Sequence, residues 1–266
     1  MRMSRISISL TFALLIFLSV VNASGCRNAL AEYKKSARSI LEEALESTDK
    51  AEDNSIQVPT STNYDEAIAK INTSAANLQT CLEEFEGFLE EAESLVPPKK
   101  VEAFHTEMLN FFAGGVKTYE ETSKLTTDLA GILQAYFGTL KAMENFSLSS
   151  SIKASEVQSL IDAVQTSTNG LQSFTLSSTI PEAQQLKQGA ISAMEAELAT
   201  YRTLKQLIAS YSKSLETQYN ALQEDYLRKT TDFINLTGEI GDRFGVQVKE
   251  MEKKCKDLMD QLESLK

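Results

Sequence analysis

The chain has 266 residues and a net charge of −11 at neutral pH, with one histidine and no tryptophan. An acidic chain without a basic block excludes nucleic acid from the expected partners, because phosphate binding relies mainly on Lys and Arg contacts. Only eleven glycines and four prolines are present, so the composition favours helices over a strand-rich fold with many tight turns.

Residues 1–25 have the pattern of a cleavable signal peptide. Arg2 and Arg5 provide a basic start, residues 6–21 are almost entirely apolar, and small residues follow. The apolar run is shorter than the roughly 20 residues that usually span a bilayer, so we prefer a signal peptide to an uncleaved membrane anchor. We therefore expect an extracytoplasmic mature chain with 24 basic and 37 acidic residues.

Two cleavage sites fit the small residues at the end of this segment. Cleavage after Ala23 satisfies the usual rule for signal peptides. Alternatively, residues 23–26 resemble the lipobox of bacterial and archaeal lipoproteins, with Ala23 where that family prefers Leu. The resemblance implies a lipidated Cys26 and a membrane tether through that lipid alone. We accordingly expect the mature protein to be secreted or lipid-anchored at the cell surface.

An extracytoplasmic location also bears on the cysteines and on the N-glycosylation sequons. In an oxidising compartment, lipidation of Cys26 would leave Cys81 and Cys255 to pair as a disulfide, whereas a free Cys26 would leave one odd thiol. Cys255 lies on a predicted apolar stripe and Cys81 lies beside one, which also suits buried thiols. Glycosylation depends on a host that carries out this modification. The asparagines that begin a sequon are Asn72, Asn145 and Asn235.

The first two predicted helices run from Cys26 to about Asp53 and from Tyr64 to about Ala92. A loop with Pro59 separates them, and Pro97–Pro98 ends the second. The second helix carries an apolar residue at steps of four and three without a slip, which is the spacing of coiled-coil packing. Its stripe comprises Tyr64, Ile68, Ile71, Ala75, Leu78, Leu82, Phe85, Leu89 and Ala92.

A third predicted helix runs from Lys99 to about Glu144 and contains Gly114–Gly115. Two adjacent glycines indicate a kink or a close helix crossing. The surrounding residues 108–116 are the most apolar interior stretch. They fit a buried crossing better than a membrane-active segment.

The segment 145–180 is predicted to be a flexible connection. It begins with a Ser-rich stretch, continues with a short helix that ends at Asn169–Gly170, and then becomes irregular, with room for a brief strand. A new helix start follows, with Thr179 as the cap, Pro181 in the first turn and Glu182 three residues after the cap.

Residues 180–266 have a helical apolar pattern almost throughout. A single rod of this length would leave its stripe unburied, so we expect antiparallel segments that fold back at Gly238, Gly241 and Gly245. The predicted fold is therefore an elongated all-α bundle, with five to six long, antiparallel, coiled-coil-like helices in one domain over residues 26–266.

Few residues suggest a catalytic or metal-binding role. Glu102 and His105 form one Glu-x-x-His step, whereas a di-iron bundle usually needs two such steps and two further carboxylates. No nucleophile elbow or phosphate-binding glycine loop is present in the sequence. We predict no metal, no cofactor and no enzymatic activity.

Four tyrosines lie at helical spacing near the end of the chain. These tyrosines fit either core positions, with each hydroxyl reaching the edge of the core, or an aromatic binding groove. They are Tyr201, Tyr211, Tyr219 and Tyr226.

The expected function is that of an exported binding or scaffolding protein, with a protein partner or self-association through exposed helical stripes. Two alternatives stay open: a helical bundle that senses or carries a small ligand, and a membrane-active, toxin-like protein. A closed, polar-lined cavity near Tyr201, Tyr211 or His105 would favour the first of these alternatives.

Overall fold

The computed structural model describes residues 25–52, 64–144 and 153–266. Over these ranges the chain forms six α-helices and one short 3₁₀ turn, and no strand is found. The predicted all-α class is confirmed. Residues 1–24 of the predicted signal peptide and Asn145 lie outside the described residues, and so does the side chain of Cys26.

The first three helices lie within a few residues of their predicted ranges. Helix α2 spans Gly25–Glu52 and α3 spans Tyr64–Ser94. After the prolines, the 3₁₀ turn η1 (Lys99–Val101) leads into α4 (Glu102–Glu144). Pro98 has extended backbone angles, φ −60° and ψ 145°, which place the chain for a new helix start.

The second half of the chain contains three helices. They are α5 (Ala154–Ser173), α6 (Pro181–Ala209) and α7 (Lys213–Ser264). Helix α6 is preceded by Ile180, which makes no side-chain cap, so the cap predicted at Thr179 is wrong. Pro181 does occupy the first turn, where its missing N–H costs nothing.

The turn between α6 and α7 corrects the predicted position of the fold-back. The chain reverses at residues 210–212, and α7 continues unbroken through Gly238, Gly241 and Gly245. Ser212 provides the local reason, because its side chain accepts a hydrogen bond of 3.2 Å from the backbone N–H of Leu215. A serine in this position caps a new helix N-terminus.

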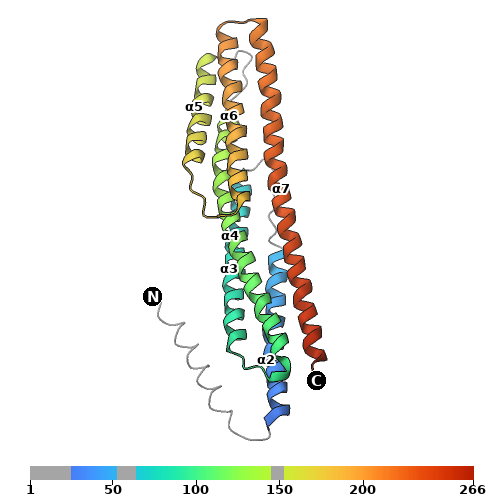
Figure 1. The fold of residues 1–266 in the computed structure, drawn as a ribbon. Helices are drawn as coiled ribbons and strands as arrows, with labels where there is room; N and C mark the ends of the chain where they lie inside the picture. The colour runs from blue at the N-terminus through green and yellow to red at the C-terminus, as the bar shows by residue number, and fades with distance from the viewer. Residues whose placement is uncertain (1–24, 53–63, 145–152) are drawn as a thin grey trace, which may run out of the picture.

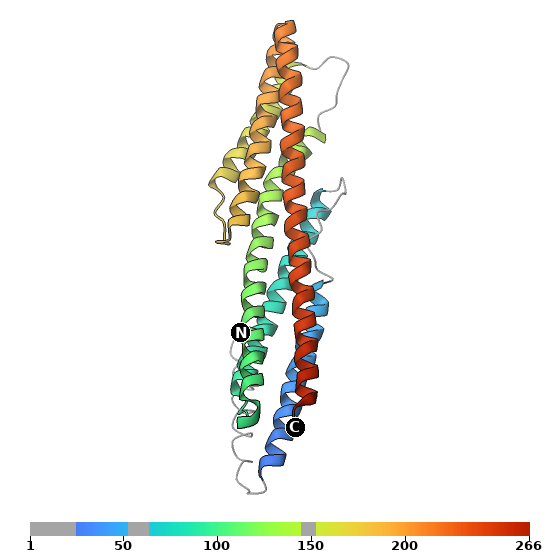
Figure 2. The ribbon, with the colours of Figure 1, turned by 45° about the vertical axis from the view of Figure 1, so that its right-hand side comes forward.

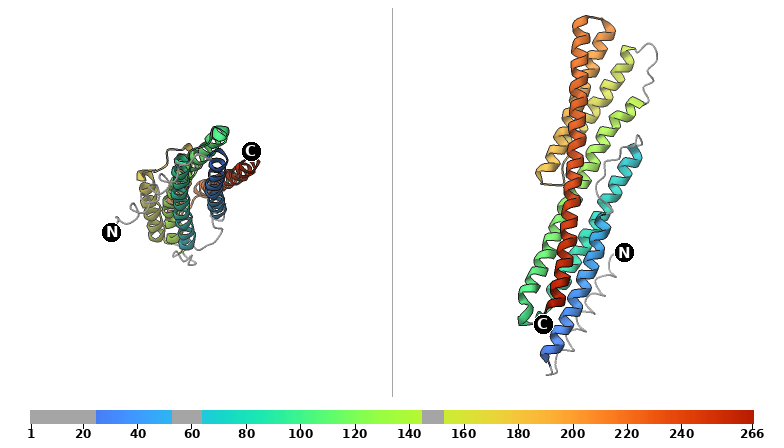
Figure 3. Two further views of the ribbon diagram at one scale, coloured as in Figure 1. Left: turned by 90° about the horizontal axis from the view of Figure 1, so that it is seen from below. Right: turned by 90° about the vertical axis from the view of Figure 1, so that its right-hand side faces the viewer.

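The six helices run alternately up and down the long axis of the molecule (Figures 1 and 2). At one end, α2 and α3 pack with the start of α4 and the end of α7 (Figure 3). At the other end, α5 and α6 pack with the rest of α4 and the first half of α7. Helices α4 and α7 therefore belong to two four-helix groups stacked end to end.

Each group encloses its own hydrophobic core. The proximal core lies between α2, α3, α4 and α7 and includes Phe85, Phe112 and Tyr119. The distal core lies mainly between α4, α5, α6 and α7 and includes Leu133, Met194 and Phe233. Both cores are large enough to hold their helices together by apolar burial.

The close crossing predicted at Gly114–Gly115 is present in the proximal core. A Cβ atom on Gly115 would lie 2.3 Å from the Phe85 ring, so only glycine lets α3 and α4 approach this closely. The ring of Phe85 in turn contacts Tyr119 with centroids 4.9 Å apart. Helix α4 stays continuous through both glycines, so Gly115 marks a close contact and neither glycine breaks the helix.

None of the described helices combines the length and the apolar character that a bilayer-spanning segment needs.

Candidate functional site

The histidine of the Glu-x-x-His step lies in the proximal core and makes a structural contact. His105 is 8% exposed, and its Nδ1 is hydrogen-bonded to the Tyr33 hydroxyl at 3.2 Å. Burial lowers the pKa of His105 and raises the pKa of Tyr33 to about 12. Glu102 lies one turn away on the exposed face of α4. Within the described residues, no cluster of three or more metal-ligating side chains is found.

Both internal cysteines are buried and free. The Cys81 thiol lies 3.8 Å from the carbonyl oxygen of Ser47, and the Cys255 thiol donates to the carbonyl oxygen of Leu41 at 3.2 Å. The disulfide predicted between them is not formed, because each thiol is directed to a different turn of α2. Burial raises the pKa of Cys81 and raises that of Cys255 to about 12. Neutral thiols of this kind are poor nucleophiles.

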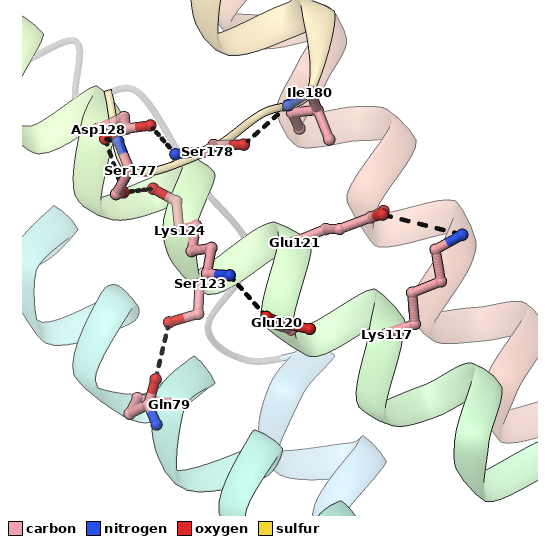
Figure 4. A network of polar contacts seen from close by, with 10 residues as sticks. All are labelled: Gln79, Lys117, Glu120, Glu121, Ser123, Lys124, Asp128, Ser177, Ser178 and Ile180. Atoms are coloured by element: carbon pink, nitrogen blue, oxygen red, sulfur yellow. Dashed lines mark hydrogen bonds and ion pairs between the residues drawn. The ribbon is translucent and has the colours of Figure 1, made fainter. Parts of the chain in front are cut away.

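A buried aspartate fastens the connection between α5 and α6. The Asp128 carboxylate on α4 is 1% exposed and accepts three hydrogen bonds of 2.8 Å (Figure 4). The donors are the backbone N–H and hydroxyl of Ser177 and the backbone N–H of Ser178. Residues 174–180 are thereby docked on α4, inside the segment predicted to be a flexible connection.

A second contact supports the same connection. A Cβ atom on Gly131 would lie 2.6 Å from the ring of Phe174, so α4 leaves room for that ring only through the glycine. Lys187 also donates to the carbonyl oxygens of Gln172 and Phe174. These contacts are structural, because each joins the connection to a helix beside it.

One buried carboxyl group is not satisfied. Glu197 on α6 is 1% exposed in the middle of the distal core, and neither of its oxygens has a hydrogen-bond partner at normal geometry. Burial raises the pKa of Glu197 to about 7. The hydroxyls of Tyr201 and Thr139 act in the opposite direction and lower it in part.

Three helices supply the polar groups around Glu197. From α4 come Tyr136 and Thr139, from α6 comes Tyr201, and from α7 come Tyr226 and Thr230. The Tyr136 hydroxyl donates to the Thr230 hydroxyl at 3.2 Å. The pKa values of all three tyrosines are raised, chiefly by burial. Glu197 and these five residues are called the Glu197 cluster below.

The tyrosines predicted as one stripe separate into different environments. Tyr201 is buried in the Glu197 cluster, and Tyr219 and Tyr226 are half-buried between α6 and α7. Tyr211 is 72% exposed in the turn between these helices, where its hydroxyl donates to Glu216 at 2.7 Å. The four tyrosines therefore extend from the distal core, at Tyr201, to the exposed surface, at Tyr211.

A small cavity lies where the two cores meet. It has a volume of about 130 Å³ and is bordered by α4, the start of α6 and α7. Arg243 and Glu182 form an ion pair of 2.7 Å on its wall. Ligand pockets usually have volumes of roughly 300–1,000 Å³, so this cavity gives little support to the alternative of a small-ligand carrier.

The two sequons within the described residues lie on helix surfaces. Asn72 on α3 and Asn235 on α7 are both exposed. Thr237, which completes the second sequon, is buried, and its hydroxyl donates to the carbonyl oxygen of Phe233.

Sequence reasoning missed Glu197 and Asp128, although a signal for each was present. Glu197 lies three residues after Met194 and four before Tyr201, at a position where the apolar stripe should continue. Asp128 interrupts the stripe of α4 in the same way. A charged residue at a stripe position indicates either a buried polar contact or a functional group.

Comparison with known proteins adds no relative: no protein-family model, no curated protein and no solved structure matches this chain.

Proposed function

We propose that this protein is an exported, non-enzymatic binding or scaffolding protein that holds a protein partner at the end of the α6–α7 hairpin. The hairpin end is defined as residues 204–232. The observation that carries the proposal is the incomplete burial of apolar side chains in this segment. It has no buried side chain along its whole, fully described length.

Apolar residues nevertheless recur along the hairpin end. Several are half-buried between the two helices: Leu204, Leu207, Leu215, Tyr219, Leu222 and Tyr226. Others point to solvent, with Tyr211 72%, Leu227 56% and Ile208 36% exposed. The stripes of the other described helices are covered mainly within the two cores, which supports a role for this end in receiving a further helix.

Charge supports the same choice of surface. Four basic and four acidic side chains cancel over residues 204–232, whereas the whole chain has a net charge of −11. Repulsion of an acidic partner, including a second copy of this chain, is therefore weaker at the hairpin end than the net charge of the whole chain suggests. The occupant we infer is an amphipathic helix of another protein, packed along α6 and α7.

Site-specific photocrosslinking in the producing cells tests this proposal. A photoreactive amino acid replaces Leu227 in one variant and, as a control, Val96 in another. Val96 is 87% exposed in the connection between α3 and α4, at the opposite end of the molecule. We expect a defined adduct from position 227 and none from position 96.

The mass of the adduct also distinguishes the possible partners. An adduct of this chain with one different protein supports the proposal. An adduct with the mass of two copies of this chain shows self-association and contradicts the inferred occupant. Equal labelling at both positions, or none at position 227, contradicts the choice of surface.

Export is a separate part of the proposal and rests on residues 1–25. The intact mass of the protein from its host provides the test. A chain beginning at Ser24 supports secretion, a diacylglycerol-sized addition on Cys26 supports lipid anchoring, and a chain that retains residues 1–25 contradicts both.

A further inference from the structure

Glu197 occupies the most enclosed part of α6. From Ala190 to Tyr201, nearly every side chain is buried or half-buried, because α4, α5 and α7 surround this stretch. Glu195 is the single exposed residue of that stretch. Two glutamates separated by one residue therefore lie in opposite environments, in water and in the distal core.

An ionised carboxylate in the position of Glu197 would have no compensating charge. The titratable groups that influence it from the packed helices are tyrosines: Tyr136 on α4, Tyr201 on α6 and Tyr226 on α7. All three are neutral near pH 7, since burial raises their pKa values further. A buried charge without a partner is strongly unfavourable.

The basic groups of α6 and α7 in this region are engaged elsewhere. Arg202 donates to Gln165 at 2.8 Å, and Lys205 donates to Gln158. On α7, Lys229 pairs with Asp225 at 3.0 Å.

Arg228 on α7 bridges two acidic residues, Asp225 and Asp232. The end of α4 carries Lys141, which pairs with Asp65 of α3 at 2.6 Å. These ion pairs lie at the surface of the four-helix group around the distal core, which is called the distal bundle below; the group around the proximal core is the proximal bundle.

Helix α5 offers no counter-charge either. Its acidic residues are Glu156, which accepts from the backbone N–H of Lys153, and Asp162, which accepts from the Gln158 side chain. Lys153, at the helix start, is exposed. Every element packed around Glu197 thus presents apolar groups or neutral hydroxyls to it.

We propose that Glu197 makes the distal bundle proton-dependent: α4, α6 and α7 stay closed around its carboxyl group while the proton is bound, and they separate more often once the proton is lost. This inference concerns regulation and does not depend on the proposed partner. A protonated carboxyl group can donate to a neighbouring hydroxyl, whereas a carboxylate must gain water, which requires the helices to open.

The direction of the pH dependence follows from proton linkage. The pKa of Glu197 is raised from 4.5 to about 7 in the folded protein, so the folded state holds the proton at pH values where the open state releases it. The contribution of Glu197 to the stability of the distal bundle is full below pH 4.5, declines as the pH rises towards 7, and levels off above that value.

Hydrogen exchange followed by mass spectrometry tests the proposal on the full chain. Exchange of α6 amides, corrected for the intrinsic effect of pH, is compared between pH 5.5 and pH 8.5. For a pKa of about 7, linkage predicts that the opening equilibrium in the distal bundle increases roughly 30-fold over this range. Amides of α2 in the proximal bundle provide the internal reference.

Two variants make the test specific. Glu197→Gln keeps the shape and cannot ionise, so its distal bundle should lose the roughly 30-fold change while the reference amides are unaffected. Glu195→Gln removes an exposed carboxyl two residues away and should behave as the wild type. Equal pH profiles in wild type and Glu197→Gln, or a change of the same size in both bundles, would overturn the proposal.

A direct measurement covers the case in which Glu197→Gln does not fold. Infrared spectroscopy of the wild-type protein reports the carbonyl band of a protonated carboxylic acid. We expect a band of about one carboxyl group to persist at pH 6.5, where exposed carboxyl groups are almost fully ionised, and to vanish by pH 8.5. Absence of the band at pH 6.5 would show that Glu197 is ionised in the closed bundle and would contradict the inference.

Discussion

Gly114 and Gly115 are adjacent in α4 and have opposite surroundings. A Cβ atom on Gly115 would meet the Phe85 ring at 2.3 Å and the Met251 side chain at 3.1 Å, whereas a Cβ on Gly114 would meet nothing within 4 Å. The contact between α3 and α4 therefore requires Gly115. Gly114 costs helix stability and gives no contact in return.

Replacing each glycine by alanine should therefore change stability in opposite directions. Gly115→Ala should lower the free energy of unfolding by about 1–3 kcal/mol, because the added methyl group forces Phe85 out of its position. Gly114→Ala should raise it by up to about 1 kcal/mol through helix propensity alone. Urea denaturation measures both, and a Gly115→Ala variant as stable as Gly114→Ala would show that the crossing is looser than described.

The polar residues of the cores show how far single residues can be interpreted from sequence. Glu197 and Asp128 both interrupt an apolar stripe, so the sequence marks them as exceptional. It does not distinguish them. Asp128 finds three donors in residues 177–178, whereas Glu197 finds neutral hydroxyls, and this difference depends on which helices surround each carboxyl group.

At the level of the helices, hydrophobic spacing predicted position and length well and predicted the last turn wrongly. The three glycines of α7 suggested a break, but glycine ends a helix mainly by adopting a positive φ, and no described glycine has one. Residues 210–212 supply the break through a capping serine.

The position of this turn depends on the Ser212 side chain. Ser212→Ala should lower the free energy of unfolding by about 1 kcal/mol, because the N–H of Leu215 loses its acceptor at the start of α7. Ser214→Ala, in the first turn of the same helix and exposed, should be nearly neutral. Thermal or urea unfolding of both variants measures the difference, and equal effects would argue against the cap.

On the scale of the whole molecule, α4 and α7 connect the two cores. Both helices run without interruption from one core into the other. Opening of one bundle exposes apolar surface on helices that the other bundle still holds. The two cores should therefore unfold together, apart from the local opening inferred around Glu197.

Tryptophan probes can measure this coupling, since the chain has no natural tryptophan. Phe88→Trp reports on the proximal core and Phe137→Trp on the distal core, and both positions lie near a core edge, 8% and 9% exposed. We expect coincident urea transitions from the two probes near pH 5.5. Midpoints that differ between the probes, beyond the effect of each substitution measured by circular dichroism, would show two independent domains.

The sequence by itself determined the all-α class, the approximate range of each helix before residue 180, and the placement of Cys81 and Cys255 at packed positions. These properties follow from local spacing, since an apolar stripe with a period of about 3.6 residues must be buried on one side of a helix. Signal-peptide cleavage, coiled-coil geometry and the partner stay predictions.

Only the tertiary structure decided which stripes meet. It placed the fold-back before α7, divided the core in two, directed the two thiols to separate turns of α2, and left Glu197 without a counter-charge. The physical reason is that packing depends on residues distant in the chain. Whether a carboxyl group is solvated, hydrogen-bonded or buried without a partner depends on its neighbours in space and not on its neighbours in sequence.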